Sequence, residues 1–218
     1  MKGILRHKQV IVFDFDGLLV NTEEIYWDGW KFAFQENNIS VSNQLISSFT
    51  GKSIEEVDRL LLNQGIDFKM LQRLREFREK YIIEMIDSPA VTLLPGVKEF
   101  LDYSISKYKL AICTSSPRKR LEKVLNSLGI LCYFDKIVAY EDTLEHKPSP
   151  MPYKKIIEHY TTPSSNIIVF EDSCSGVLSA KKNGLETHCV NKFLTSEHLK
   201  ICLPDFCHKS FYEVMNKL

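Results

Sequence analysis

The chain has 218 residues, of which 44% are hydrophobic and 26% are charged, a composition typical of a folded protein with one large domain or a domain plus an insertion. Lysine and arginine number 28, as do aspartate and glutamate, so the formal net charge of zero excludes a general attraction to nucleic acid or to anionic membranes. The six cysteines lack the regular spacing of a disulfide framework, and no apolar run is long enough for a signal peptide or a bilayer span. We therefore expect a cytoplasmic monomer with reduced thiols.

The first predicted element is a short buried strand, Val10–Phe13, because its apolar residues include β-branched side chains. Two aspartates and a glycine follow it, although aspartate is a poor strand former and is costly to place beside a core. Residues 22–85 then have almost no strand character and contain three helical patterns, which is too much chain for one crossover. We predict a helical cap domain, residues 21–87, whose aromatic side chains form its own core, inserted into a core domain of residues 1–20 and 88–218.

From residue 88 onward, short apolar runs alternate with helical patterns. Strands are expected at residues 110–113, 136–139, 166–170 and 187–190, and helices at residues 97–106, 118–128, 152–160 and 175–183. Such an alternation builds parallel sheets with right-handed crossovers. The predicted fold class is therefore α/β, with a doubly wound, Rossmann-like parallel sheet as the core and an inserted α-helical cap.

Acidic residues follow two of these strands, at the edge where an open α/β sheet binds its ligand. Asp14 and Asp16 are two residues apart in an extended chain, so both carboxylates can face one crevice while Phe15 packs away from it. Glu171 and Asp172 follow a later strand. Carboxylates that share a crevice repel one another unless a cation lies between them. An oxygen-rich cluster without nearby histidine or thiol ligands favours Mg²⁺, and Mg²⁺ in turn favours a phosphate substrate.

Hydroxyl groups and a lysine complete this set. Thr114, Ser115 and Ser116 offer hydroxyl and backbone N–H donors at a strand-to-helix junction, and Lys147 offers a compact positive charge. Taken singly, the three hydroxyl residues would be an ordinary helix N-cap and Lys147 an ordinary residue at a helix entry. Taken together with the acids, they resemble a site for phosphoryl transfer.

Four segments, "DFDGLLVNTE", "TSS", "HKPSP" and "FEDS", resemble in their order and separations the four motifs of the haloacid dehalogenase superfamily. The resemblance runs from Asp14 to about Gly184. The place of the helical insertion resembles the branch that contains β-phosphoglucomutase and many phosphatases of small metabolites, and "FTGKS" at residues 49–53 is similar to the cap loop of that branch. The motifs are specific because all four occur in register.

The resemblance implies a two-step phosphoryl transfer. Asp14 would be the nucleophile that forms an aspartyl phosphate, and Asp16 would protonate the leaving oxygen and later take a proton from the hydrolytic water. Thr114 and Lys147 would bind the oxygens of the transferring group. Because a carboxylate that attacks a phosphate dianion meets a like charge, the lysine and a metal cation are both required.

The resemblance also implies a ligand set and a substrate-binding set. Mg²⁺ would be held by the Asp14 carboxylate, the Asp16 backbone carbonyl and Asp172, with Glu171 close by or acting through water. The predicted substrate-binding residues come from the second strand, from the cap loop and from the first cap helix: Ser115, Ser116, Gly51, Lys52, Tyr26 and Trp27.

The function predicted in this way is a Mg²⁺-dependent phosphatase acting on a small phosphorylated metabolite such as a sugar phosphate, a polyol phosphate or a nucleoside monophosphate. One alternative is a β-phosphoglucomutase-type mutase, although Tyr26 and Ile54 stand where those mutases carry a histidine and an arginine. The mutases also have Lys-Asn at the position of Pro117-Arg118, where Arg118 could still contact a distal phosphate. The other alternative is a non-catalytic protein that binds a phosphorylated metabolite, but such a relative would be expected to have lost an essential acid.

Two further motifs are rejected. "TGKS" is not a phosphate-binding P-loop, because Ile46 stands where that motif needs glycine and no strand precedes it. A zinc site could be assembled from cysteines and histidines near the C-terminus, but the C-x₄-C spacing is irregular and ordinary packing explains these residues better. The residues concerned are His198, Cys202, Cys207 and His208.

Overall fold

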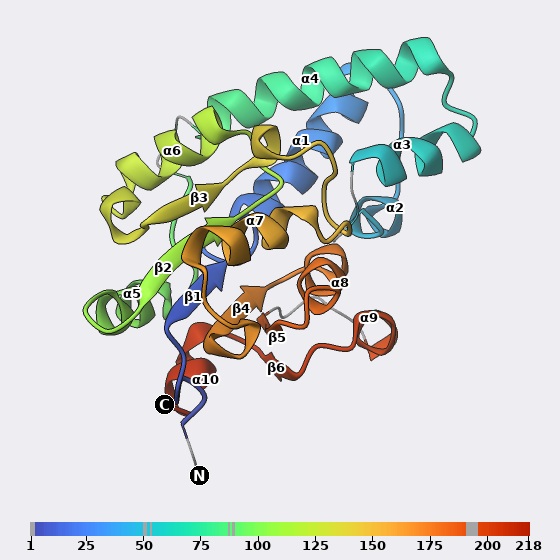
Figure 1. Ribbon diagram of the computed structural model, residues 1–218. Helices are drawn as coiled ribbons and strands as arrows, with labels where there is room; N and C mark the ends of the chain where they lie inside the picture. The colour runs from blue at the N-terminus through green and yellow to red at the C-terminus, as the bar shows by residue number, and fades with distance from the viewer. Residues whose placement is uncertain (1–2, 50–51, 53, 87, 89, 191–195) are drawn as a thin grey trace. The chain divides into compact units, whose positions relative to one another are not determined.

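The computed structural model describes residues 3–49, 52, 54–86, 88, 90–190 and 196–218 (Figure 1). The chain divides into two compact units. Met1–Val20 and Thr92–Leu218 form an α/β unit, and Asn21–Val91 form a helical unit inserted into its sequence. Across the described ranges, no helix has both the length and the apolar character needed to cross a membrane.

The α/β unit is built on a parallel sheet that has six strands within the described residues. The strand order is β3-β2-β1-β4-β5-β6, and Val10 pairs with Lys109 on one side and with Ile167 on the other. The predicted doubly wound parallel sheet is confirmed, and its central strands end at the same edge. The strands are β1 (Val10–Phe13), β2 (Lys109–Cys113), β3 (Lys136–Val138), β4 (Ile167–Glu171), β5 (Glu186–Val190) and β6 (Phe206–His208).

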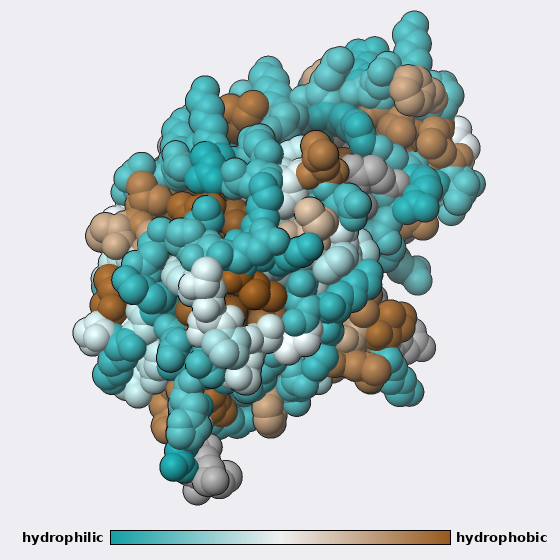
Figure 2. All heavy atoms as spheres, viewed as in Figure 1, coloured by the Kyte–Doolittle hydropathy of each residue, from teal (hydrophilic) through white to brown (hydrophobic). Residues whose placement is uncertain are grey.

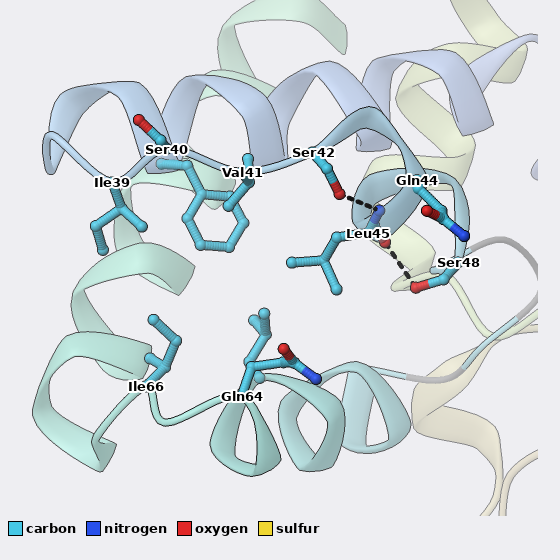
Figure 3. A pocket seen from close by; sticks show the side chains of 11 residues that line it. Ile39, Ser40, Val41, Ser42, Gln44, Leu45, Ser48, Gln64 and Ile66 are labelled. Atoms are coloured by element: carbon cyan, nitrogen blue, oxygen red, sulfur yellow. Dashed lines mark hydrogen bonds between the residues drawn. The ribbon is translucent and has the colours of Figure 1, made fainter.

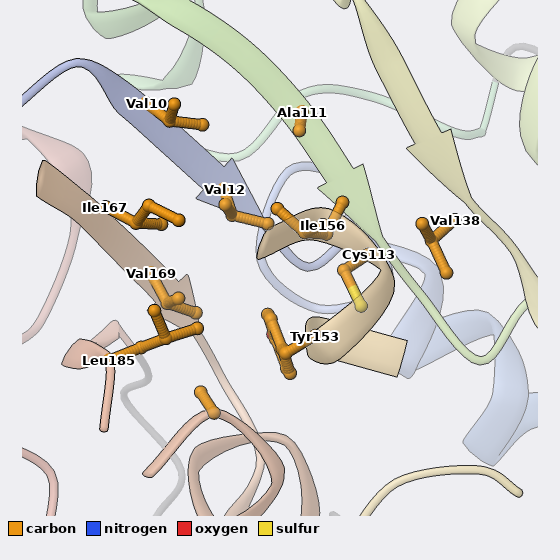
Figure 4. Packing of buried hydrophobic residues seen from close by; sticks show 11 residues of the cluster. Val10, Val12, Ala111, Cys113, Val138, Tyr153, Ile156, Ile167, Val169 and Leu185 are labelled. Atoms are coloured by element: carbon orange, nitrogen blue, oxygen red, sulfur yellow. The ribbon is translucent and has the colours of Figure 1, made fainter. Parts of the chain in front are cut away.

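One face of the sheet is covered by α7 (Met151–Tyr160) and α8 (Cys174–Lys181). Because alternate residues of a strand point to opposite faces, Val10 and Val12 both lie on this side. They share a buried cluster with Tyr153 of α7, which Figure 4 shows among the strand residues. Helix α7 thus contributes a core residue, and the predicted catalytic lysine, Lys147, lies in the segment just before this helix begins.

The opposite face is covered by α5 (Val97–Ile105) and α10 (Phe211–Met215). Phe13 points to this side, and its ring centroid lies 6.0 Å from that of Phe100 and 6.1 Å from that of Phe211. Strands buried on both faces are expected to be apolar throughout, which explains why the sequence shows short continuous runs and not an alternation.

Several elements near the C-terminus were not among the predicted ones. β6, α9 (Ser196–Cys202) and α10 are all short, and β6 has one buried residue of three, so its sequence has no continuous apolar run. In the part of the α/β unit that the structure describes, the other elements are α6 (Arg118–Ser127) and three 3₁₀ turns. The turns span Leu131–Tyr133, Tyr140–Asp142 and Ser164–Asn166.

Exposed apolar side chains lie on α9, on β6 and between them. Figure 2 shows brown spheres at the place that α9 occupies in Figure 1, on a face that is otherwise mostly hydrophilic. Ile201, Leu203 and Phe206 are exposed there, and β6 is an edge strand of the sheet.

The α/β unit is closed by hydrogen bonds where the insertion leaves it and returns. Gly17 has φ of 73°, in the left-handed region that favours glycine, and its N–H donates to the carbonyl of Val20 at 3.0 Å. Val20 forms an antiparallel bridge with Leu93, and the N–H of Leu94 donates to the carbonyl of Leu19 at 2.9 Å. The outgoing and returning segments are therefore paired with each other.

The helical unit consists of α1 (Thr22–Glu36), α2 (Asn43–Ser47), α3 (Ile54–Asn63) and α4 (Phe68–Ile86) in the described part of the chain. Helices α1 and α4 pack along each other. The predicted aromatic core of this unit is confirmed. Its buried cluster contains Trp30, Phe34, Phe49, Leu61 and Leu74. The short helix α2 was not predicted; it begins at an N-cap serine, Ser42, whose hydroxyl accepts from the N–H of Leu45 at 3.1 Å.

Candidate active site

The predicted residues of the α/β unit gather at the carboxyl edge of its sheet. The ladder continues one residue beyond β1 and β2: the N–H of Asp14 donates to the carbonyl of Phe170, and the N–H of Thr114 to that of Val138. Asp14 and Thr114 are buried, and Glu171 ends the neighbouring strand β4. The sheet register therefore brings together residues that are more than 150 positions apart in sequence.

Lys147 links these strand ends. Its ammonium donates to Oδ1 of Asp14 at 2.6 Å, to Oε1 of Glu171 at 2.5 Å and to the backbone carbonyl of Cys113 at 2.8 Å. The lysine side chain is only 4% exposed. An ammonium has three protons, so all of them are used by the protein itself.

The charges of this group shift one another's pKa. Burial, the largest cause, and the Glu171 carboxylate both raise the pKa of Asp14, while the Lys147 ammonium lowers it; the net result is a pKa of about 7. Burial lowers the pKa of Lys147, but Asp14 and Glu171 outweigh it and hold that pKa above its ordinary value. Lys147 is therefore a permanent cation among several acids.

A metal ion would be accommodated among the same acids. Carboxylate oxygens of Asp14, Glu171 and Asp172 lie within 4.8 Å of one another, and all three residues are buried. The three carboxyl groups have one ammonium among them, which contacts Asp14 and Glu171, so the buried site holds more negative than positive charge when all are ionised. An all-oxygen donor set of this kind suits a hard divalent cation such as Mg²⁺. The residues present thus fit the metal that the sequence predicts.

Asp16 lies beside this cluster but takes a different partner. Its Oδ2 accepts a short hydrogen bond from the hydroxyl of Ser116, and Ser116 is buried. The N–H of Ser116 in turn donates to the hydroxyl oxygen of Thr114 at 3.0 Å, whereas Ser115 is exposed. The N-cap of α6 is Pro117, with no side-chain hydrogen bond, so the alternative that these hydroxyls merely cap a helix is wrong.

The sequence model of a family described as haloacid dehalogenase-like hydrolase matches residues 11–190, which is most of the chain. The chain belongs to this family. The superfamily recognised from the four motifs, and the prediction of an enzyme, are therefore confirmed.

Named relatives of this hydrolase extend over nearly the same length. It is 27% identical to a validoxylamine A 7'-phosphate phosphatase from Streptomyces hygroscopicus, over 94% of this chain and 95% of the relative. It is 29% identical to a phosphorylated carbohydrates phosphatase from Thermotoga maritima, over 82% of both chains. It also resembles a solved structure from Thermotoga maritima, described as a candidate β-phosphoglucomutase, with a TM-score of 0.74 at 26% identity over 95% of this chain and 97% of the other.

The residues predicted to bind substrate from the helical unit have the following places. Tyr26 and Trp27 are half-buried on α1; the Arg78 guanidinium lies 5.3 Å from the centre of the Tyr26 ring, and Trp27 packs against the core of the unit. Lys52 is exposed, and Gly51 lies outside the described residues. Their role in binding stays a prediction.

The helical unit also contains a groove of about 590 Å³ (Figure 3). Ile39, Val41, Leu45 and Ile66 contribute apolar side chains to its lining, with Gln44, Gln64 and three serines beside them. None of the described residues predicted to bind substrate is among its lining residues.

Two sequence-based alternatives can be compared with the structure. Arg118, considered as a contact for a distal phosphate, donates to Asp142 at 2.5 Å, to Glu122 at 3.2 Å and to the carbonyl of Ile137 at 3.2 Å. Its guanidinium is thus engaged in ion pairs of the α/β unit. Within the described ranges, the group of side chains that could hold a metal ion is Asp14, Glu171 and Asp172.

Sequence reasoning gave no site role to Tyr153, which contacts the site. Tyr153 is fully buried, and its hydroxyl donates to Oε1 of Glu171 at 2.7 Å. In the sequence it stands within a helical pattern of core residues, six positions after Lys147. Its helical position predicts burial correctly, but no pattern identifies the partner of a buried phenol.

Proposed function

We propose that this hydrolase is a phosphatase that removes phosphate from a small phosphorylated metabolite, such as a sugar phosphate, a polyol phosphate or a nucleoside monophosphate. The observation that carries the proposal is the buried Asp14 carboxylate bonded to Lys147, with the carboxylate of Asp16 two residues further on. The phosphatase relatives, one of them named for phosphorylated carbohydrates, support the same class of reaction.

The proposed mechanism has two steps. First, an oxygen of the Asp14 carboxylate bonds to phosphorus while the bond from phosphorus to the leaving oxygen breaks, and Asp16 gives that oxygen a proton. Second, water attacks the phosphorus of the aspartyl phosphate and gives a proton to Asp16, while the bond from phosphorus to Asp14 breaks. Inorganic phosphate and the free enzyme result. The hydroxyl of Ser116, bonded to Asp16, would hold this acid/base in place.

Lys147 would serve the same reaction by its charge. It already neutralises part of the negative charge on Asp14, and in this structure all its ammonium protons are used. To bind a phosphoryl oxygen it must exchange one of these partners, so its first role is to hold Asp14. Thr114, buried beside it at the end of β2, would offer its hydroxyl to the phosphoryl group.

Mg²⁺ would be held by the Asp14 carboxylate, the Asp16 backbone carbonyl and Asp172, with Glu171 at its side. When bound, it would supply positive charge to the phosphoryl oxygens and so reduce the repulsion between substrate and nucleophile. The inserted helical unit would act as a cap that carries substrate specificity, with Tyr26, Trp27, Gly51 and Lys52 as the residues to test.

A generic aryl phosphate tests the chemistry. We expect phosphate release that stops when a chelator removes the metal and returns with added Mg²⁺, and that Asp14→Asn abolishes. Asp102→Asn is the matched control, because Asp102 is an exposed acid paired with Lys98 and should leave the rate unchanged. Full activity of Asp14→Asn, or release without metal, would contradict the mechanism.

A panel of sugar phosphates, polyol phosphates and nucleoside monophosphates, ranked by kcat/KM, would identify the substrate class. Interconversion of hexose phosphates without net phosphate release would instead favour the mutase. The likeness to the Thermotoga maritima structure is the observation that supports this alternative. Binding of phosphorylated compounds without any turnover would favour the non-catalytic alternative.

A further inference from the structure

The Glu171 carboxylate accepts hydrogen bonds from five donors. It has no exposed surface. Its Oε1 accepts from the Lys147 ammonium at 2.5 Å and from the Tyr153 hydroxyl at 2.7 Å. Its Oε2 accepts from the Ser173 hydroxyl at 3.1 Å and from the N–H groups of Asp172 and Ser173 at 3.2 and 3.4 Å. A carboxylate with five donors is held in one orientation.

The first turn of α8 closes directly over this carboxylate. A Cβ added to Gly176 would lie 1.9 Å from Oε1 of Glu171 and 2.1 Å from Oε2, far inside any allowed contact. Glycine is therefore required at this position for the helix to pack against the acid. The close contact leaves Glu171 no room to turn away from its donors.

Tyr153 approaches the same carboxylate from α7. It is one of the largest fully buried side chains, and its ring packs in the core cluster shown in Figure 4 together with Cys113 and Val169. The Lys147 nitrogen lies 5.2 Å from the centre of the ring. The phenol hydroxyl and the lysine ammonium thus share one acceptor, Oε1 of Glu171, while the ammonium also holds Asp14.

We propose that Tyr153 is a positioning residue of the active site: its hydroxyl fixes the Glu171 carboxylate, and Glu171 in turn holds the Lys147 ammonium against Asp14. Without the phenol hydroxyl, Oε1 would keep Lys147 as its single donor. The ammonium would then be drawn toward Glu171 and away from Asp14, because a buried oxygen that has lost one donor binds the remaining one more strongly. The effect on catalysis rests on the proposed phosphatase function, whereas the effect on Lys147 does not.

A pair of matched variants tests the effect on Lys147. Tyr153→Phe removes the proposed hydrogen bond, and Tyr160→Phe makes the same change on the same helix, where the hydroxyl is buried without a hydrogen-bond partner in the described part of the chain. The measurement is the NMR signal of the Lys147 side-chain ammonium in metal-free protein labelled with ¹⁵N-lysine, assigned by its loss in Lys147→Met. We expect a shifted signal and faster proton exchange in Tyr153→Phe, and an unchanged signal in Tyr160→Phe.

Kinetics with an aryl phosphate test the consequence. We expect Tyr153→Phe to lower kcat by about 10-fold, the effect of one hydrogen bond to a charged group, with KM changed less than twofold. Tyr160→Phe should leave both constants unchanged. If Tyr153 acts through Glu171, the double variant with Glu171→Gln should be no slower than Glu171→Gln alone, since the two changes break the same link.

The outcomes separate the two proposals. An unchanged Lys147 signal in Tyr153→Phe, or losses in kcat that simply add, would overturn the positioning role. A shifted signal in a protein that releases no phosphate from any substrate would leave the positioning role in place and overturn the phosphatase. Circular dichroism of each variant confirms that the fold is retained before the comparison is made.

Discussion

Two buried polar networks lie in the same sheet, and they differ in how their charges balance. At the carboxyl edge, the single ammonium of Lys147 faces Asp14 and Glu171, with Asp172 nearby. At the far side of the sheet, His188 of β5 lies between two partners: its Nδ1 is 3.0 Å from Nε2 of His208, and its Nε2 is 3.0 Å from Oε1 of Glu186.

The second network is balanced where the first is not. Lys8 pairs with Glu186 at 2.7 Å, one cation for one anion, and the further cation beside His208, Lys217 at 3.5 Å, is exposed to solvent. Burial lowers the pKa of His188 and of His208, so both rings are neutral at physiological pH. A balanced network of this kind serves folding, whereas an excess of buried negative charge is costly unless a ligand compensates for it. The contrast identifies the carboxyl edge as the place where a bound cation would stabilise the protein.

Removal of Lys147 should have the largest effect on stability. Lys147→Met leaves two buried carboxylates without their shared cation, so we expect the free energy of unfolding in chelator to fall by about 3–5 kcal/mol, together with loss of phosphate release. Urea denaturation measures the change. Lys154→Met is the control, because Lys154 is exposed and should change stability by no more than about 0.5 kcal/mol. Equal stability of the two variants would mean that the carboxyl edge is as well balanced as the histidine network.

A methyl group at Gly176 should have the next largest effect. Within a helix, glycine to alanine ordinarily stabilises by up to about 1 kcal/mol. Here the methyl group would collide with the Glu171 carboxylate, so we expect Gly176→Ala to destabilise by about 1–3 kcal/mol and to lower kcat. Ser175→Ala, in the same turn, removes only a 3.3 Å contact between the Ser175 and Ser173 hydroxyls and adds no methyl group beside Glu171, so it should destabilise less than Gly176→Ala. A gain in stability for Gly176→Ala would show that the carboxylate can move aside.

The histidine network should make the smallest contribution to stability, and this contribution should be lost only at acidic pH. The folded-state pKa of His208 is about 4, because burial and the neighbouring His188 oppose its protonation, against about 6.5 for an unfolded histidine. Since the unfolded chain then binds more protons, this contribution to stability is complete above pH 6.5 and is lost as the pH falls toward 4. We expect a loss of about 1–2 kcal/mol between pH 7 and pH 5 in urea denaturation.

The matched variants for this prediction are His208→Gln and His159→Gln. The pH dependence should become weaker in the first variant and stay the same in the second, whose histidine is exposed. Phosphate release at pH 7 should be retained in both. A His208→Gln protein that folds but has lost activity would show that this network takes part in catalysis. The difference drawn between the histidine network and the carboxyl edge would then be wrong.

The sequence predicted the framework of the site well because parallel strands bring their carboxyl ends to one edge. Val10–Phe13 was predicted with its observed bounds, and the meeting of Asp14, Lys147 and Glu171 followed from the strand order of a doubly wound sheet. β6 could not be found in the same way, since a three-residue edge strand with exposed side chains has no periodic pattern.

Side-chain partners were harder to predict than backbone positions. Asp16 and Asp14 are two residues apart, yet Asp16 accepts a hydrogen bond from Ser116 while Asp14 accepts one from Lys147. The partner of Tyr153 depends on how α7 is rotated on the sheet, which the helical pattern fixes only as buried or exposed. The directions of the Tyr26 and Trp27 side chains relative to a substrate likewise do not follow from the helical pattern, so their role in binding stays a prediction.

The pairing of Val20 with Leu93, and of Leu94 with Leu19, has a consequence for how this protein can change. The two ends of the 71-residue insertion, Asn21–Val91, are joined to neighbouring positions of one small ladder. Because the α/β unit already holds the two ends of the insertion together, changing the length or sequence of the segment between them costs little additional chain entropy. The α/β unit can therefore accept a different insertion without being rebuilt, and with the helical unit in its proposed role as a specificity cap, the substrate would be changed by exchanging one continuous stretch of chain.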